Sequence, residues 1–210
     1  MPEYPVELDT ISAGYDDRLV LDGLSARFAA STTTAVTGAN GAGKSTLLAV
    51  IAGVQQVRGG VVRRASTRIA FVPQRSAVTD RLPVTVAEVV AMGRWAGGRF
   101  FGRLSERDRM LVAESIAALG LTGLERRSLS TLSGGQRQRA FVAQGLAQRA
   151  DILLLDEPTV GLDAEARELI GRAIASAAAG GACVIHATHD AESIDAADAV
   201  LALGAAKVSS

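Results

Sequence analysis

The distribution of apolar residues divides the chain into three parts. In the first third, short apolar runs predict strands at 5–11, 18–29 with an interruption, 33–37, 61–65 and 69–73, with a helix from the Gly-rich turn after 37 to about residue 53. In the last third the runs alternate, and they predict strand 151–156, helix 164–179, strand 182–188, helix 190–196 and strand 198–203. Such alternation indicates a parallel sheet with helices packed on its faces.

The middle third has a helical pattern instead. Residues 85–94 predict a helix, and Ser105 opens a second one with a capping-box-like start. Apolar residues then fall on one helical face up to a plausible stop at Gly120, and the glycines and phenylalanines of 97–102 predict a mobile loop. We therefore expect one α/β domain over 1–210, with a core of 1–76 and 141–210 and an inserted helical subdomain at 77–140.

Composition narrows the class of protein. The chain has 210 residues, 48% of them apolar, which is enough for a substantial core and excludes a disordered chain. The 22 basic and 22 acidic residues balance, so no basic footprint of a dedicated nucleic-acid binder is present. We expect a nucleic acid not to be a partner.

Several features predict a soluble, cytoplasmic protein. The single cysteine, Cys183, lies in an apolar run and cannot form an internal disulfide, which favours a reducing compartment. No stretch approaches the roughly 20 apolar residues that cross a bilayer. The N-terminal residues lack the basic and apolar regions of a signal peptide. Any membrane-spanning function would belong to other chains.

A glycine-rich loop between a predicted strand and a predicted helix matches the pattern G-x-x-x-x-G-K-[ST]. Its glycines allow successive backbone N–H groups to curl around a phosphate, and the helix N-terminus adds unpaired donors. Lys44, one of only two lysines, supplies a charge to the β and γ oxygens, and Ser45 can ligate Mg²⁺. The predicted nucleotide-binding loop comprises Gly38, Ala39, Asn40, Gly41, Ala42, Gly43, Lys44, Ser45 and Thr46.

Two adjacent acids end the apolar strand at 152–156. Because side chains alternate along a strand, Asp156 and Glu157 point in different directions. Asp156 would face a magnesium ion, directly or through a water. Glu157 could reach the water that attacks the γ-phosphorus and act as the general base. Pro158 would end the strand pairing.

The segment Leu-Ser-Gly-Gly-Gln at 132–136 resembles the signature of the ATP-binding-cassette (ABC) ATPases. Other landmarks resemble the family in order along the chain. Tyr15 matches the adenine-stacking aromatic, although it could be an ordinary edge-strand tyrosine. Gln74 matches the glutamine at the junction with the helical lobe, where it could contact Mg²⁺ or the attacking water. The Gly-Leu-Asp at 161–163 matches the segment at the dimer interface, and His189 matches the switch histidine that senses the γ-phosphate.

The resemblance spans nearly the whole chain and implies the ABC ATPase fold, including an N-terminal antiparallel β subdomain. It implies ATP and Mg²⁺ as cofactors, with Ser45, Gln74 and Asp156 near the metal. In the family the signature, here Ser133, Gly134, Gly135 and Gln136, faces the γ-phosphate held by the Lys44 of a second copy. Two ATP molecules would then be buried between head-to-tail subunits, with Asp163 at the interface. The pair would bind integral-membrane permease subunits on the inner face of the membrane.

Three short segments, 72–76, 82–86 and 92–94, resemble ATPases of zinc and manganese importers. We expect a metal importer of that type, with iron-chelate uptake as the alternative and a metal-binding solute-binding protein as an indirect partner. No cluster of Cys and His residues would itself bind the cargo.

Two other readings remain. The first is a soluble cassette that acts on nucleic acid or ribosomes or assists cluster assembly; the nucleic-acid types need a long coiled-coil insertion or two cassettes, and neither is present. A catalytically silent cassette is disfavoured by Glu157 and His189.

A few residues stay open. We expect His186, inside an apolar strand, to be structural. Trp95 and the phenylalanines at 100–101 could belong to a permease-docking surface or to the core. The turn at 30–32 lacks the Gly that relatives usually carry, so its geometry is uncertain from sequence. We expect no added regulatory domain after the last strand.

Overall fold

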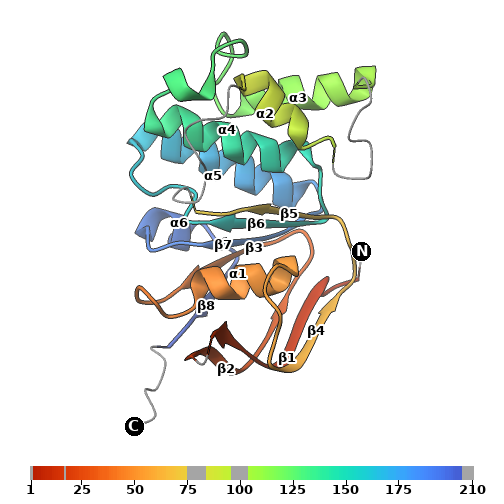
Figure 1. Ribbon diagram of the computed structural model, residues 1–210, viewed down its shortest axis with the longest axis vertical. Helices are drawn as coiled ribbons and strands as arrows, with labels where there is room; N and C mark the ends of the chain where they lie inside the picture. Colours follow the sequence, from red (N-terminus) through yellow and green to blue (C-terminus); the bar gives the residue numbers. More distant parts are fainter. Residues whose placement is uncertain (1, 17, 75–83, 96–103, 205–210) are drawn as a thin grey trace.

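The computed structural model describes residues 2–16, 18–74, 84–95 and 104–204. It contains an antiparallel three-stranded sheet, a parallel five-stranded sheet and helices on both faces of the latter (Figure 1). The loop expected at 97–102, including both phenylalanines, lies outside the described residues. Among the described residues, no helix combines the length and apolar character needed to span a membrane.

The antiparallel sheet has the order β2-β1-β4. Its strands are β1 (Val6–Tyr15), β2 (Arg18–Phe28) and β4 (Gly59–Arg64). The expected end at residue 11 and the expected interruption in 18–29 are wrong, because β1 and β2 pair as one long hairpin from Val6↔Phe28 to Tyr15↔Arg18. The pairing register of β1 shifts between Leu8 and Ile11, and Thr10, which lies within this irregularity, has φ of 50°. A Cβ on Gly60 of β4 would lie 2.3 Å from the Thr10 carbonyl oxygen, so only glycine fits beside this irregularity.

The parallel sheet has the order β5-β6-β7-β3-β8. Its strands are β3 (Thr33–Thr37), β5 (Ile69–Val72), β6 (Ile152–Asp156), β7 (Cys183–Ala187) and β8 (Ala199–Ala202). Strands β3, β6 and β7 are buried along nearly their whole length, as expected for continuous apolar runs covered on both faces. The parallel pairing brings the carboxyl ends of β3, β6 and β7 to one edge of the sheet.

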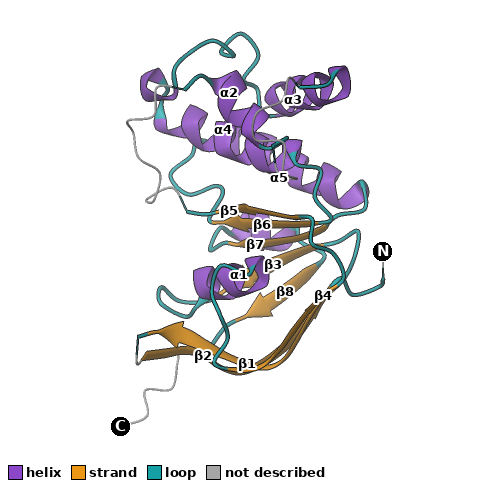
Figure 2. Ribbon diagram, turned by 45° about the vertical axis from the view of Figure 1, so that its right-hand side comes forward, coloured by secondary structure: helices purple, strands orange, loops and turns teal. Residues whose placement is uncertain are grey.

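The two faces of this sheet carry different helices (Figure 2). On one face lie α1 (Lys44–Ala52) and the antiparallel sheet, which pack against the side chains of Ile152 and Leu154. Leu153 and Leu155 point to the opposite face, which carries α2 (Val86–Met92), α3 (Glu106–Ala118), α4 (Gly134–Ala147) and α5 (Ala164–Ala179). Helix α6 (Ala191–Asp195) follows β7. The alternation of side chains in β6 therefore joins two separate hydrophobic clusters.

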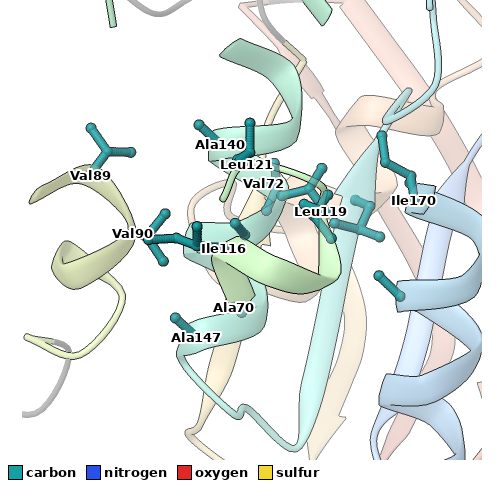
Figure 3. Close-up of a cluster of buried hydrophobic side chains, with 14 of the residues drawn as sticks. Ala70, Val72, Val89, Val90, Ile116, Leu119, Leu121, Ala140, Ala147 and Ile170 are labelled. Atoms are coloured by element: carbon teal, nitrogen blue, oxygen red, sulfur yellow. The ribbon is translucent and has the colours of Figure 1, made fainter. Parts of the chain in front are cut away.

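The second face holds a well-packed helical layer (Figure 3). Helices α2 and α3 start with the capping boxes of Thr85 and Ser105, and a short 3-10 helix, Leu129–Thr131, precedes α4. Arg94 joins three helices, because its Nε lies 2.8 Å from Asp108 Oδ1 and its Nη1 donates to the Ala147 carbonyl at 2.8 Å. Helix α4 runs without interruption through residue 140, where the division between helical subdomain and core was expected.

Three further residues can be placed. Trp95 is partly buried at the end of α2, and Cys183 is buried, with burial raising the pKa of its thiol to about 12. Ser31, in the turn where relatives usually carry Gly, has φ of 58°, a left-handed conformation that favours glycine. The turn therefore keeps this geometry without the glycine.

Candidate functional site

The glycine-rich loop joins β3 to α1. Gly43 is the N-cap of α1 with φ of 98° and makes no side-chain cap hydrogen bond, so the first N–H groups of the helix are available to a ligand. A Cβ at Gly43 would lie 2.7 Å from the Leu21 Cδ2 atom of β2, so both conformation and space require glycine. The loop turns within itself, with Ala42 N–H donating to the Ala39 carbonyl at 3.0 Å. This loop has the form of a phosphate cradle.

Lys44 is the first residue of α1, and its side chain is buried, 8% exposed. Its ammonium group donates to the Gly38 carbonyl at 2.9 Å. It also lies 3.7 Å from Oε1 of Glu157. Burying an ammonium group is costly unless charge and hydrogen bonds compensate it, and here a carbonyl and a carboxylate do so. The charge is held at the mouth of the loop.

Glu157 connects this lysine with His189. Nδ1 of His189 lies 2.9 Å from Glu157 Oε2, which is within hydrogen-bond distance. Glu157 is 9% exposed, whereas the His189 side chain is 66% exposed. The two residues meet because β6 and β7 are neighbours with Asp156 opposite Ala187. The contact orients one oxygen of Glu157 and leaves the histidine in reach of solvent.

The backbone of Glu157 has an uncommon conformation. Its φ is 50°, in the left-handed region that a non-glycine residue rarely adopts. Its N–H donates to the Ala187 carbonyl at 3.1 Å, which holds this turn directly after β6. Backbone strain of this kind concentrates at functional sites, so the conformation supports a functional role for the carboxylate that it aims at Lys44.

Asp156 fits a magnesium ligand. It is 3% exposed, and its Oδ1 has no hydrogen-bond partner. Burial raises its pKa, and the charge of Glu157 acts in the same direction, while the Ser45 hydroxyl, Lys44 and the Gln74 backbone oppose them. A carboxyl oxygen without a partner beside a serine hydroxyl suits Mg²⁺, which takes few protein ligands when phosphate oxygens complete its shell.

The remaining residues near Asp156 indicate which groups would share the magnesium ion. The described residues contain no group of three or more His, Cys, Asp or Glu side chains that would hold a metal alone. Ser45 and Asp156 would hold the ion together with nucleotide phosphates, and the ion would neutralise part of the phosphate charge. Gln74 contributes its backbone near Asp156 but is otherwise exposed.

The predicted signature residues cap α4. The Ser133 N–H donates to Gln136 Oε1 at 3.0 Å, and the Gln136 N–H donates to Ser133 Oγ at 3.2 Å. Ser133 is exposed and can still donate its hydroxyl proton to an anion. A Cβ on Gly135 would lie 3.3 Å from Leu162 Cδ2, so the signature adjoins the segment at 161–163. Within one chain, however, α4 and α1 pack on opposite faces of the parallel sheet.

Asp163 and Tyr15 lie in exposed positions. Asp163 is the N-cap of α5, and its Oδ1 accepts the Ala166 N–H at 2.8 Å. Tyr15 ends β1 and is 52% exposed. It belongs to the hairpin whose Leu21 contacts the phosphate loop, but its ring remains free to stack.

Arg167 lies beside these segments, although no sequence motif singles it out. Its Nη1 donates to the Leu162 carbonyl at 3.2 Å, and its Nε lies 3.9 Å from Glu192 Oε2 on α6. An arginine in the first turn of a helix has no local motif, and its acidic neighbour is far along the chain. Only the fold brings this residue to the site.

His186 lies on β7 but away from these groups. It is 3% exposed, and its Nδ1 has no hydrogen-bond partner. Burial lowers its pKa to about 4, so it is neutral near pH 7. Because Cys183 and Ile185 face the α1 side, His186 faces the helical layer together with Val184. This position suits the structural role expected for it.

The family described as ABC transporter matches residues 21–160. The manganese transport system ATP-binding protein MntB of Halalkalibacterium halodurans is 37% identical over 171 residues, which cover 79% of this chain and 68% of that protein. The zinc transport system ATP-binding protein TroB of Treponema pallidum is 35% identical over 198 residues, which cover 91% of this chain and 74% of that protein. The hemin import ATP-binding protein HmuV of Streptomyces coelicolor is 40% identical over 187 residues, which cover 82% of this chain and 65% of that protein.

A solved structure supports the same family. It is an inward-facing ABC transporter described as being of metal-chelate type, with a TM-score of 0.84 and 28% identity over 96% of this chain and 79% of that one. The glycine-rich loop, the acidic end of β6 and the capped start of α4 all lie within the residues that match this family. The chain belongs to the ABC transporter family, and it is an ATPase whose hydrolysis of ATP is coupled to transport.

Proposed function

We propose that this ATPase drives uptake of a divalent metal ion, zinc or manganese, and that Glu157 is its general base. The contact of Glu157 with both Lys44 and His189 carries the proposal for the site. The named manganese and zinc transport relatives, which match most of the chain, support the cargo.

The residues would divide the hydrolysis step as follows. The loop N–H groups and Lys44 bind the β- and γ-phosphates, and Tyr15 stacks on the adenine. Glu157 would accept a proton from the water as the water oxygen bonds to the γ-phosphorus, the bond from that phosphorus to the bridging oxygen breaks, and ADP leaves. His189 would hold the carboxylate in place and reach toward the γ-phosphate, and Gln74 would lie near the attacking water or the magnesium ion.

The signature would act on the nucleotide of a second copy. Ser133 and the N–H groups of Gly134 and Gly135 form an anion site at a helix start. Since α1 and α4 pack on opposite faces of the sheet, a head-to-tail pair provides a direct way for Ser133 and Lys44 to bind the same phosphate. Asp163 would lie at that interface.

The pair would work beneath integral-membrane permease subunits, on the inner face of the membrane. The transport coupling of the family requires a membrane-spanning path, and no helix in the described ranges provides one. A metal-binding solute-binding protein would deliver the cargo to those subunits and would contact this chain only indirectly.

Iron-chelate uptake is the second candidate. The hemin import relative and the metal-chelate-type transporter structure both favour it. The relatives named above are transport or import proteins, and they favour a transport role over a soluble, non-transport cassette.

The base assignment is tested by Glu157→Gln. The amide keeps the shape of the side chain but cannot accept the proton, so we expect turnover to fall at least 100-fold, in line with the loss of general-base catalysis. Binding of a fluorescent ATP analogue should change by less than about threefold, because Lys44 and the loop remain. The matched control is Glu168→Gln on the exposed face of α5, which should behave as wild type. Substantial hydrolysis by Glu157→Gln would remove Glu157 from the base role.

The cargo is tested by uptake. Cells that express the chain with its membrane subunits are given radiolabelled Mn²⁺, Zn²⁺ or hemin, with Lys44→Ala as the inactive control. Lys44-dependent uptake of Mn²⁺ or Zn²⁺ supports the proposal. Lys44-dependent uptake of hemin alone would move the assignment to iron chelates.

A further inference from the structure

Arg167 occupies a position between two segments that both lead to Glu157. It lies in the first turn of α5, and its Nη1 donates to the carbonyl of Leu162 at 3.2 Å. Leu162 belongs to the segment that begins at Glu157 and ends at Asp163, the N-cap of α5. The side chain thus folds back and fixes the end of the segment that follows the carboxylate.

The other side of the same guanidinium faces α6. Its Nε is buried without a hydrogen-bond partner and lies 3.9 Å from Glu192 Oε2. The charge of Arg167 also helps to lower the pKa of Asp190, after the larger effect of the Ser193 hydrogen bond. Asp190 directly follows His189 and is the N-cap of α6. Arg167 therefore lies against the segment that carries the histidine.

The strength of the ion pair is not what makes this arrangement useful. The Glu192 side chain is 80% exposed, and an exposed pair at 3.9 Å contributes little to stability. What the guanidinium provides is a fixed planar fork, with one nitrogen bound to the Leu162 carbonyl and another directed toward α6. Lysine carries its donors on a single nitrogen, so it cannot place one nitrogen at the Leu162 carbonyl and another toward α6.

We propose that Arg167 is a positioning residue that holds the 158–163 segment and the His189 segment in a fixed relation, so that His189 keeps Glu157 oriented for hydrolysis. The inference rests on the proposed role of Glu157. It assigns to Arg167 an effect on the chemical step and none on nucleotide binding, because its guanidinium contacts the Leu162 carbonyl and faces Glu192, whereas the Gly38 carbonyl holds Lys44.

The proposal is tested on the full chain assembled with its membrane subunits, by ATP hydrolysis and by binding of a fluorescent ATP analogue. In Arg167→Ala we expect kcat to fall roughly tenfold or more, since a small misplacement of a catalytic group is enough for such a loss. KM and analogue binding should stay within about twofold of wild type, because no phosphate contact is removed. Arg167→Lys should recover only part of kcat.

Arg172→Ala is the matched control. Arg172 is on the same helix and pairs with Glu168 at 2.6 Å on the exposed surface, so its removal should leave kcat unchanged. If Arg167→Ala has wild-type kcat, or if it loses hydrolysis and binding together with a lower melting temperature, the positioning role is overturned.

A double-mutant cycle distinguishes this role from a merely structural one. If Arg167 acts through His189, Arg167→Ala should lower kcat much less in the His189→Ala background than in wild type. Equal loss in both backgrounds would overturn the proposal. Glu157→Gln is measured in parallel, because hydrolysis by that variant would overturn the base assignment whatever the result at Arg167.

Discussion

Two features of Glu157 lower the free energy of unfolding: its backbone conformation and its buried charge. Its left-handed backbone costs on the order of 1–3 kcal/mol, and its carboxylate is nearly buried beside Lys44. The ion pair and the His189 contact compensate the buried charge but not the backbone strain. A glycine or asparagine would relieve that strain, so the presence of glutamate here is better explained by chemistry than by stability.

His186 should make the free energy of unfolding depend on pH. Its pKa is lowered by burial from 6.5 to about 4, so the folded protein holds it neutral. Between pH 6.5 and 4 the unfolded chain binds more protons than the folded one, and the free energy of unfolding therefore falls as the pH falls through this window. At about 1.4 kcal/mol per pKa unit, we expect a loss of about 2–3 kcal/mol between pH 7.5 and 4.5.

The measurement compares urea unfolding of wild type and His186→Gln at the two pH values. Glutamine is polar and does not titrate, so the variant should lack this part of the pH dependence. Asp156, whose raised pKa acts in the opposite direction, is common to both proteins and cancels in the difference. An equal pH dependence in the two proteins would show that His186 is not held neutral.

At the scale of elements, α4 packs closely on β5. A Cβ on Gly145 of α4 would lie 2.6 Å from Val72 Cγ2, and the β-branched valine has little freedom to move away. We therefore expect Gly145→Ala to lower the free energy of unfolding by about 1–3 kcal/mol, the usual cost of overpacking. Equilibrium urea unfolding measures the change.

Gly171 on α5 provides the matched control. No atom lies within 4 Å of a Cβ built there, so Gly171→Ala should gain up to about 1 kcal/mol of helix propensity. If both alanine variants were stabilised alike, the close approach of α4 to β5 would be wrong.

At the scale of the whole molecule, the decisive feature is the separation of the signature from the phosphate loop. Helices α4 and α1 cover opposite faces of the parallel sheet, so pairing of two copies is the arrangement that would bring Ser133 to the phosphates at Lys44. ATP would then lie between the subunits and favour their association, and hydrolysis would release it.

This arrangement predicts the oligomeric state. Glu157→Gln with ATP should form a dimer that light scattering after size exclusion detects, because the nucleotide persists. Adding Ser133→Arg should keep the protein monomeric with ATP still bound, since the bulky cation blocks the anion site only for the partner's phosphate. Ser176→Arg, on an exposed part of α5, is the control and should leave the dimer intact. A dimer that survives Ser133→Arg would contradict the head-to-tail arrangement.

Much of the local structure follows from short stretches of sequence. The glycine-rich turn into α1, the cap at Ser105 and the strand ending at Asp156 were all predicted, because each depends on neighbouring residues and on a period of two or 3.6. The long β1–β2 hairpin was missed, because strand ends depend on a partner strand that periodicity does not identify.

The sequence by itself therefore determined the residue types of the site and the order of its elements, since phosphate loops and strand-end carboxylates have local signals. Only the tertiary structure decided which side chains meet. Lys44 and His189 are far from Glu157 along the chain, and Arg167 joins two segments that no motif relates. These contacts depend on the strand order β5-β6-β7-β3-β8, which brings several strand ends to one edge. Long-range packing sets that order, and no local propensity encodes it.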